Sequence, residues 1–134
     1  MKYRKTYKGF IIYLLIFCAV LILGGVVSVW KNFMPALIIV NTMTIGITGL
    51  MYVIYKTENV YWINGIEYEK AFLAGSERRK KFALQHLKRM GTATIFGLVL
   101  SGVSLMFGWN SWVIYAIVII TFIGSAISTI TLDL

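Results

Sequence analysis

Charged side chains are scarce in this chain of 134 residues, and so are the side chains on which most catalytic and metal sites are built. Only 13% of the residues are charged and 59% are hydrophobic, whereas about a quarter of a soluble domain is charged. Cysteine, histidine and proline each occur once. A chain this small cannot bury so much apolar surface in a water-soluble core, because small folds bury the smallest fraction of their surface. We therefore expect its solvent to be lipid.

The single cysteine and the single histidine exclude several kinds of site. Cys18 lies in an apolar run without a second cysteine, which excludes a disulfide scaffold and a redox carrier with paired cysteines. His86 is expected in a different compartment, so neither a His/Cys metal site nor a Cys-His nucleophile can be assembled. No glycine-rich phosphate motif of the P-loop type occurs. We therefore predict a protein that is not an enzyme and has no cofactor or metal.

Four stretches contain no charged residue and no histidine, and each is long enough to cross a bilayer. About 20 helical residues, at ~1.5 Å rise each, cross a hydrocarbon core of ~30 Å. The stretches lack the alternation of barrel strands. They comprise residues 10–30, 36–55, 92–109 and 112–132. The sequence thus predicts an all-α integral membrane protein, a single four-helix membrane domain over residues 1–134.

The connections between the spans predict two antiparallel hairpins joined by a long basic segment, residues 56–91. The other two connections, residues 31–35 and 110–111, are too short for anything but tight hairpins. Twelve of the thirteen Lys and Arg residues lie in the N-terminal tail or in segment 56–91, and Lys31 alone lies on the other side. Basic residues mark the cytoplasmic face. We expect a multi-pass plasma-membrane protein with both termini and segment 56–91 in the cytoplasm, and with an uncleaved first helix.

Small and hydroxyl-bearing residues recur at helical spacing in the last two spans. They are Gly97, Ser101, Ser104 and Gly108 in the third span, and Thr121, Gly124 and Ser128 in the fourth. Helices in lipid associate through close backbone approach and interhelical hydrogen bonds, so we interpret these stripes as packing seams. A polar pathway through the bundle is the alternative. Asn41, the only carboxamide in a span, is either a polar membrane site or one partner of an interhelical hydrogen bond.

Segment 56–91 is expected to form a helix, a turn and a second helix. Asn64 and Glu67 resemble a capping box before a helix over residues 68–73, and Gly75 is suited to end that helix. Ser76 can then cap the second helix. Because the second helix has both basic residues and an apolar face, we expect it to lie at the headgroups before it turns into the third span.

The cations of the second helix predict contact with lipid or with a protein partner. They are Arg78, Arg79, Lys80, Lys81, Lys88 and Arg89. Anionic inner-leaflet lipids attract such residues, by about 1 kcal/mol for each cation near the surface. The nearby glutamates, Glu58 among them, are expected to form ion pairs with these cations. The net charge of +8 does not indicate nucleic-acid binding, because it is positive-inside charge and no nucleic-acid motif accompanies it.

Two stretches of segment 56–91 resemble known small membrane proteins. Residues 62–66 (Trp-Ile-Asn-Gly-Ile) and 77–91, between two apolar hairpins, resemble small multi-pass membrane proteins of unknown function from Gram-positive bacteria. The segment is also similar to the connecting region of SdpI-type toxin-immunity membrane proteins, although it lacks the Arg-Thr that follows the Asn-Gly in that family. The resemblance implies an accessory or self-protection role in the plasma membrane. It carries over no catalytic residue.

The leading functional prediction is an accessory or immunity protein that binds another membrane protein or a toxin. The missing catalytic chemistry, the packing stripes and the basic segment favour it. The alternative is a small oligomeric channel, holin or transporter that uses Asn41 and the Ser/Thr stripes. Proton-coupled transport is disfavoured because no ionisable group lies within a span. The expected partners are therefore the bilayer with its anionic lipids, and either another membrane protein or further copies of this chain.

Overall fold

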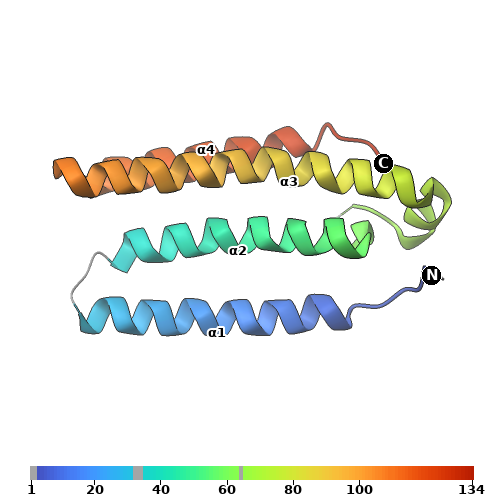
Figure 1. Ribbon diagram of the computed structural model, residues 1–134, viewed down its shortest axis with the longest axis horizontal. Coiled ribbons are helices and arrows are strands. Elements are labelled where there is room, and N and C mark those ends of the chain that lie inside the picture. The colour runs from blue at the N-terminus through green and yellow to red at the C-terminus, as the bar shows by residue number, and fades with distance from the viewer. Residues whose placement is uncertain (1–2, 32–34, 64) are drawn as a thin grey trace.

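The computed structural model describes residues 3–31, 35–63 and 65–134, and it consists of long helices joined by short connections (Figure 1). Helix makes up 84% of the chain, with no strand in the described ranges. The elements are α1 (Lys8–Trp30), α2 (Pro35–Thr57), the 3₁₀ helix η1 (Val60–Trp62), α3 (Tyr68–Phe107) and α4 (Ser111–Thr129). All four α-helices are long and apolar enough to cross a membrane. This confirms the prediction of an all-α chain with four long apolar helices.

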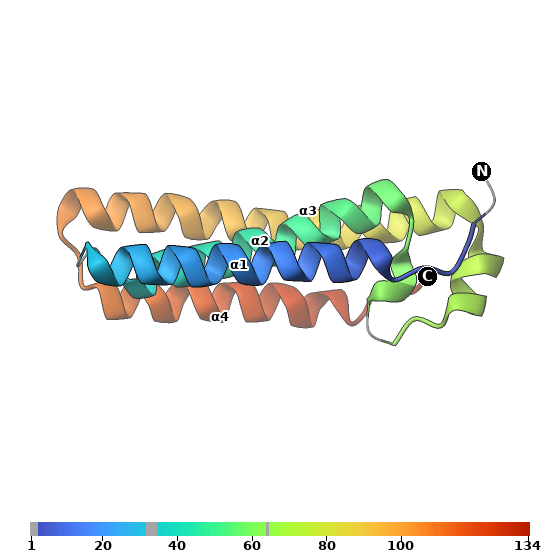
Figure 2. The same ribbon diagram turned by 90° about the horizontal axis from the view of Figure 1, so that it is seen from below.

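Helices α2, α3 and α4 pack on one another, whereas α1 lies on the outer side of α2 (Figures 1 and 2). Gly24 of α1 lies beside Ile38 of α2, and Phe17, earlier in α1, lies against Gly46, later in α2. Contacts therefore proceed in opposite sequence directions along these two helices. The beginning and the end of the chain lie at the same end of the bundle (Figure 1).

Two clusters of apolar side chains lie at opposite ends of the bundle. The larger one joins Ile54 of α2, Val60 of η1 and Phe82 of α3, and all three side chains are buried. The smaller one, at the other end, joins Leu37 of α2 with Val118 of α4. Between them, α2 and α3 are linked mainly by hydroxyl and amide groups. The apolar packing therefore stabilises both ends of the α2–α4 unit, with a polar seam in the middle.

Helix α3 departs from the expectation for segment 56–91. Its start at Tyr68 and its break at Gly75, which has a φ of 76°, agree with the prediction, while Asn64 lies outside the described residues. From Ser76, however, the helix continues without interruption to Phe107. The expected turn before the third span is therefore wrong. No proline interrupts this stretch, and the apolar face that was assigned to lipid packs on α2 and η1 instead.

Two glycines of α2 form the contact with α1. The ring of Phe17 lies so close to Gly46 that a Cβ atom there would overlap it, and the Tyr13 hydroxyl lies in the space that a Cβ at Gly49 would need. That hydroxyl also donates a hydrogen bond of 2.5 Å to the Gly46 carbonyl. Glycines allow this close approach because they have no side chain. Helix α1 is thus held on α2 by two aromatic rings seated on glycine backbone.

Replacing Gly46 with alanine is expected to weaken the contact between α1 and α2. The added methyl forces the Phe17 ring out of position, and overpacking of this kind costs about 1–3 kcal/mol. The matched control is Gly124→Ala, where a Cβ meets nothing within 4 Å and better helix propensity adds up to about 1 kcal/mol. Thermal unfolding in detergent should show a lower midpoint for Gly46→Ala alone. Equal midpoints for both variants would contradict this packing.

Candidate functional site

Asn41 is used in helix packing. Its Nδ2 atom donates to the Ser101 hydroxyl of α3 at 3.0 Å and to the Leu37 carbonyl of its own helix at 3.0 Å. Two turns further along α2, the Thr48 and Thr94 hydroxyls lie 2.8 Å apart. These groups satisfy one another, which removes the cost of placing them in an apolar medium. Within one chain, the Asn41 amide therefore forms an interhelical hydrogen bond between α2 and α3.

Three of the four small residues predicted for packing in the third span are buried in α3: Gly97, Ser101 and Ser104. A Cβ at Gly97 would lie 3.0 Å from the Val118 side chain of α4, so glycine permits the close approach of α3 and α4. Gly108 has a different role. It is exposed, has a φ of 65° in the left-handed region, and ends α3. A residue without a Cβ adopts this conformation at little cost.

The stripe predicted in the fourth span is divided between two environments. Gly124 is exposed, with no atom within 4 Å of the position of a Cβ, so it does not belong to a seam within the chain. Thr121 and Ser128 are half-buried and face a crevice between α3 and α4. The three residues recur at helical spacing, but they lie on adjoining and different parts of the α4 surface.

The six predicted cations have three different environments. Arg78, Lys81 and Lys88 are exposed. Lys80 is also largely exposed, with its Nζ atom 3.4 Å from a carboxylate oxygen of Glu58. Arg79 is buried, with only 6% of its surface exposed. Arg89 is half-buried beside α4.

Arg79 is enclosed by groups from three parts of the chain, which we call the Arg79 cluster (Tyr3, Glu58, Ala71, Ser76 and Arg79). Its Nη2 atom lies 2.9 Å from the Glu58 carboxylate, and Nη1 donates to the Ala71 carbonyl at 3.1 Å. The ring of Tyr3 lies on the guanidinium, 3.9 Å from Cζ. The charge of Arg79 is therefore paired inside the protein. It departs from the expectation of a lipid or partner contact.

Glu58 is the acceptor at the centre of the Arg79 cluster. Its φ of 60° turns the chain away from the end of α2, and its carboxylate accepts a hydrogen bond of 2.8 Å from the Ser76 hydroxyl. Burial alone would raise the pKa of Glu58, but hydrogen bonds from Ser76, Arg79 and Lys80 outweigh burial and lower the pKa. The resulting anion lies where α3 resumes after Gly75, a position that the helix dipole favours. Ser76 thus donates to Glu58, rather than serving only as a cap.

The N-terminal tail is attached to the same end of the bundle. The Tyr3 hydroxyl donates to the Glu58 carbonyl, and the Tyr68 hydroxyl donates to the Tyr3 carbonyl, both at 3.1 Å. Trp62 Nε1 donates to the Thr6 carbonyl at 2.9 Å. Burial raises the pKa of Tyr3 to about 12, despite the opposing charge of Arg79. The tail, η1 and the start of α3 are thus joined by hydrogen bonds and ring contacts at this end of the bundle.

Removal of the Arg79 charge should destabilise the protein strongly. Arg79→Gln leaves the half-buried Glu58 carboxylate without its main partner, and losing hydrogen bonds to a charged group costs about 1.5–3 kcal/mol. Arg78→Gln is the matched control, because its side chain is exposed and surface changes stay within about 0.5 kcal/mol. The free energy of unfolding in detergent tests this. Similar losses in the two variants would show that the cluster is not a stabilising element.

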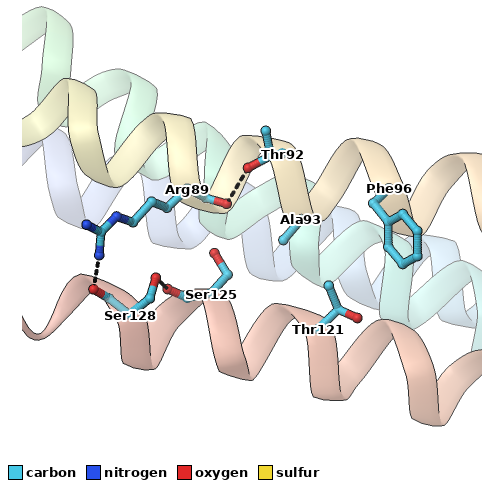
Figure 3. A pocket seen from close by; sticks show the side chains of 7 residues that line it. All are labelled: Arg89, Thr92, Ala93, Phe96, Thr121, Ser125 and Ser128. Carbon is cyan, nitrogen blue, oxygen red and sulfur yellow. Dashed lines mark hydrogen bonds between the residues drawn. The ribbon is translucent and has the colours of Figure 1, made fainter.

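A crevice with polar and apolar lining residues lies between α3 and α4 (Figure 3). It has a volume of about 440 Å³. The lining residues are Arg89, Thr92, Ala93, Phe96, Thr121, Ser125 and Ser128. We call it the Arg89 crevice. Arg89 donates from Nη1 to the Ser128 carbonyl across it.

Ser125 has the one polar side-chain atom that is buried without a hydrogen-bond partner among the described residues. Its hydroxyl points from α4 toward α3, between the positions of Arg89 and Phe96 (Figure 3). A buried hydroxyl without a partner costs about 1–3 kcal/mol. The crevice therefore combines a cation, a hydroxyl without a partner and an aromatic ring.

The single histidine and the single cysteine lie apart from this crevice. His86 is buried in α3 beside Phe82, and burial lowers the pKa of its imidazole. Cys18 is exposed on α1. In the part of the chain that the structure describes, no group of three His, Cys, Asp or Glu residues is placed to hold a metal ion.

Sequence reasoning missed Ser125 and the central role of Glu58. Ser125 lies four residues after Thr121 and three before Ser128, so helical spacing could have placed it on the same face. Glu58 was expected only as one of several ion-paired glutamates. No glycine or proline marks the end of α2, so the sequence contains no signal for the left-handed turn at Glu58. A glutamate adopts this conformation only when tertiary contacts hold it.

No family model, no curated protein and no solved structure matches this chain. The resemblance of segment 56–91 to SdpI-type immunity proteins thus stays a prediction. The function is inferred below from the sequence and the geometry.

Proposed function

We propose that this chain is a non-enzymatic protein of the plasma membrane that acts by binding another membrane protein, as an accessory subunit or as an immunity protein against a membrane-active toxin. In this proposal the four helices insert as two antiparallel hairpins joined by segment 56–91. The observation that supports partner binding is the position of α1, which packs on α2 and leaves most of its surface exposed.

The charge distribution supports the orientation. The Arg79 cluster and the charged first half of α3 lie at the end of the bundle that also holds the N-terminal tail (Figure 1). Lys31 follows α1 at the other end and is the only charged residue there. Because basic residues stay on the cytoplasmic side, the cluster end faces the cytoplasm in this proposal.

The orientation predicts which cysteines an impermeant maleimide will label in intact cells. In a Cys18→Ser background, Lys31→Cys should be labelled from outside, because that position lies at the outer end of the first hairpin. Lys5→Cys and Glu77→Cys, both exposed in the structure, should be labelled only after permeabilisation. Labelling of Lys5→Cys or Glu77→Cys in intact cells would contradict this topology.

Helix α1 has one face on α2 and the opposite face free. Ser28 is its only buried residue over Lys8–Trp30, a range described in full. Tyr13 and Phe17 face α2, whereas Leu15, Ala19 and others lie on the opposite side and are exposed. Lipid tails cover such a face, but a small residue such as Ala19 also allows the backbone of another helix to approach closely. We propose a transmembrane helix of the partner as the occupant of this face.

The channel alternative has less support in the geometry. The polar groups that would line a pathway, Asn41 with Ser101 and Thr48 with Thr94, bond to one another across α2 and α3. Opening a pathway there would break these bonds in an apolar medium, where they are costly to lose. A pore would therefore have to form between copies of the chain, away from this seam.

Partner binding is tested by purification from the native cells in a mild detergent. A different membrane protein should be recovered with the wild-type chain in fixed ratio, and Ala19→Phe should reduce its yield about tenfold, because one lost interface contact of about 1.4 kcal/mol has that effect. Ala116→Phe is the matched control, since Ala116 is exposed on α4. Recovery of the chain alone, or only as a homo-oligomer, would contradict the proposal and favour the channel.

A further inference from the structure

Arg89 is the one half-buried residue among the six predicted cations. Among the described residues, its charge has no carboxylate within ion-pair distance, because the ion pairs involve Lys70, Arg79 and Lys80 only. Its known acceptor is the neutral Ser128 carbonyl. A half-buried guanidinium with one neutral acceptor retains several donors for an anion.

The hydroxyl of Ser125 supplies a second donor beside Arg89. Its Oγ atom is buried and has no partner within the described chain, and it points into the crevice (Figure 3). A phosphate oxygen accepts hydrogen bonds from both a guanidinium and a hydroxyl. The volume of about 440 Å³ falls in the range of small-molecule sites, ~300–1,000 Å³.

The position of the crevice along α3 indicates which molecule carries the phosphate. Arg89 is the last charged residue before the uncharged stretch of α3. Phe96 lies seven residues further along, which is ~10 Å toward the middle of the proposed span. In the proposed orientation, the charged end of the crevice therefore lies at the depth of the headgroups of the cytoplasmic leaflet. Its apolar end lies at the depth where the acyl chains begin.

We infer that the Arg89 crevice binds the phosphodiester of one phospholipid, with the phosphate on Arg89 and Ser125 and an acyl chain along Phe96. This inference rests on the proposed insertion in the membrane but not on the proposed protein partner. It differs from diffuse attraction of lipid by the exposed cations, since Lys88 carries the same charge one residue away and lies outside the lining of the crevice.

The experiment uses the full chain, purified in detergent and freed of lipid. Phosphatidylglycerol or phosphatidylcholine is added, and native mass spectrometry counts the bound lipids. One phosphatidylglycerol should bind tightly to the wild type. Arg89→Gln should weaken it about tenfold, as expected for one charge-assisted hydrogen bond, and Lys88→Gln by less than about twofold. Equal losses in both variants, or no phospholipid bound to the wild type, would overturn the inference.

A second variant covers the case in which Arg89→Gln fails to fold, as judged by helix content. Ser125→Ala removes a hydroxyl that has no partner within the described chain, so its helix content should be unchanged while phosphatidylglycerol binds several-fold more weakly. Unchanged binding in Ser125→Ala would overturn the inference in that case.

A soluble phosphate is the competing source of the same chemistry. Inorganic phosphate that displaces phosphatidylglycerol at millimolar concentration would overturn the assignment to lipid. Maleimide labelling separates the two levels of proposal. If labelling confirms the topology but no lipid binding that depends on Arg89 is found, only the inference about the crevice is wrong. If labelling contradicts the topology, both the proposed function and this inference lose their basis.

Discussion

The ion pair between Arg79 and Glu58 is the interaction on which the end of the bundle beside the N-terminal tail depends. It joins the end of α2 to the part of α3 that begins after Gly75. The ring of Tyr3 lies on Arg79 and so attaches the N-terminal tail to the same group. Two charges taken out of water are tolerated only when both are hydrogen-bonded as well as paired. Ser76, Lys80 and the Ala71 carbonyl supply those bonds. The turn at Glu58, with its positive φ, is held by this network.

Packing in the proposed membrane region follows a different rule. Lipid gives no hydrophobic driving force between helices, so close approach and hydrogen bonds must replace it. Gly46 and Gly97 permit the approach, and Asn41 with Ser101 supplies the bond. Helix α1 lacks such bonds to α3 and α4. Its remaining surface is therefore covered by whatever the surroundings supply, which is lipid or, in our proposal, a partner helix.

The sequence predicted the helices well because their signal is long and uniform. Stretches without charge define α1, α2 and α4 to within a few residues, and Gly75 marked the break in α3. It could not separate Arg79 from Arg78, since neighbouring arginines have the same charge and differ only in what they face after folding. The continuity of α3 was missed because the apolar face of a basic helix fits lipid and protein equally well. In the structure this apolar face packs on α2 and η1, and α3 continues without a turn.

Arg79 and Arg89 lie on the same basic helix but have different electrostatic environments. Arg79 meets a carboxylate brought by the turn after α2, and its charge is neutralised within the chain. Arg89 meets only a carbonyl and hydroxyls of α4, which cannot neutralise it. A positive charge at the edge of a low-dielectric region is stable only when an anion or water approaches it. In the proposed insertion Arg89 lies at the depth of the lipid phosphates, so the lack of a carboxylate on α4 leaves its charge to be neutralised by a phosphate of the bilayer.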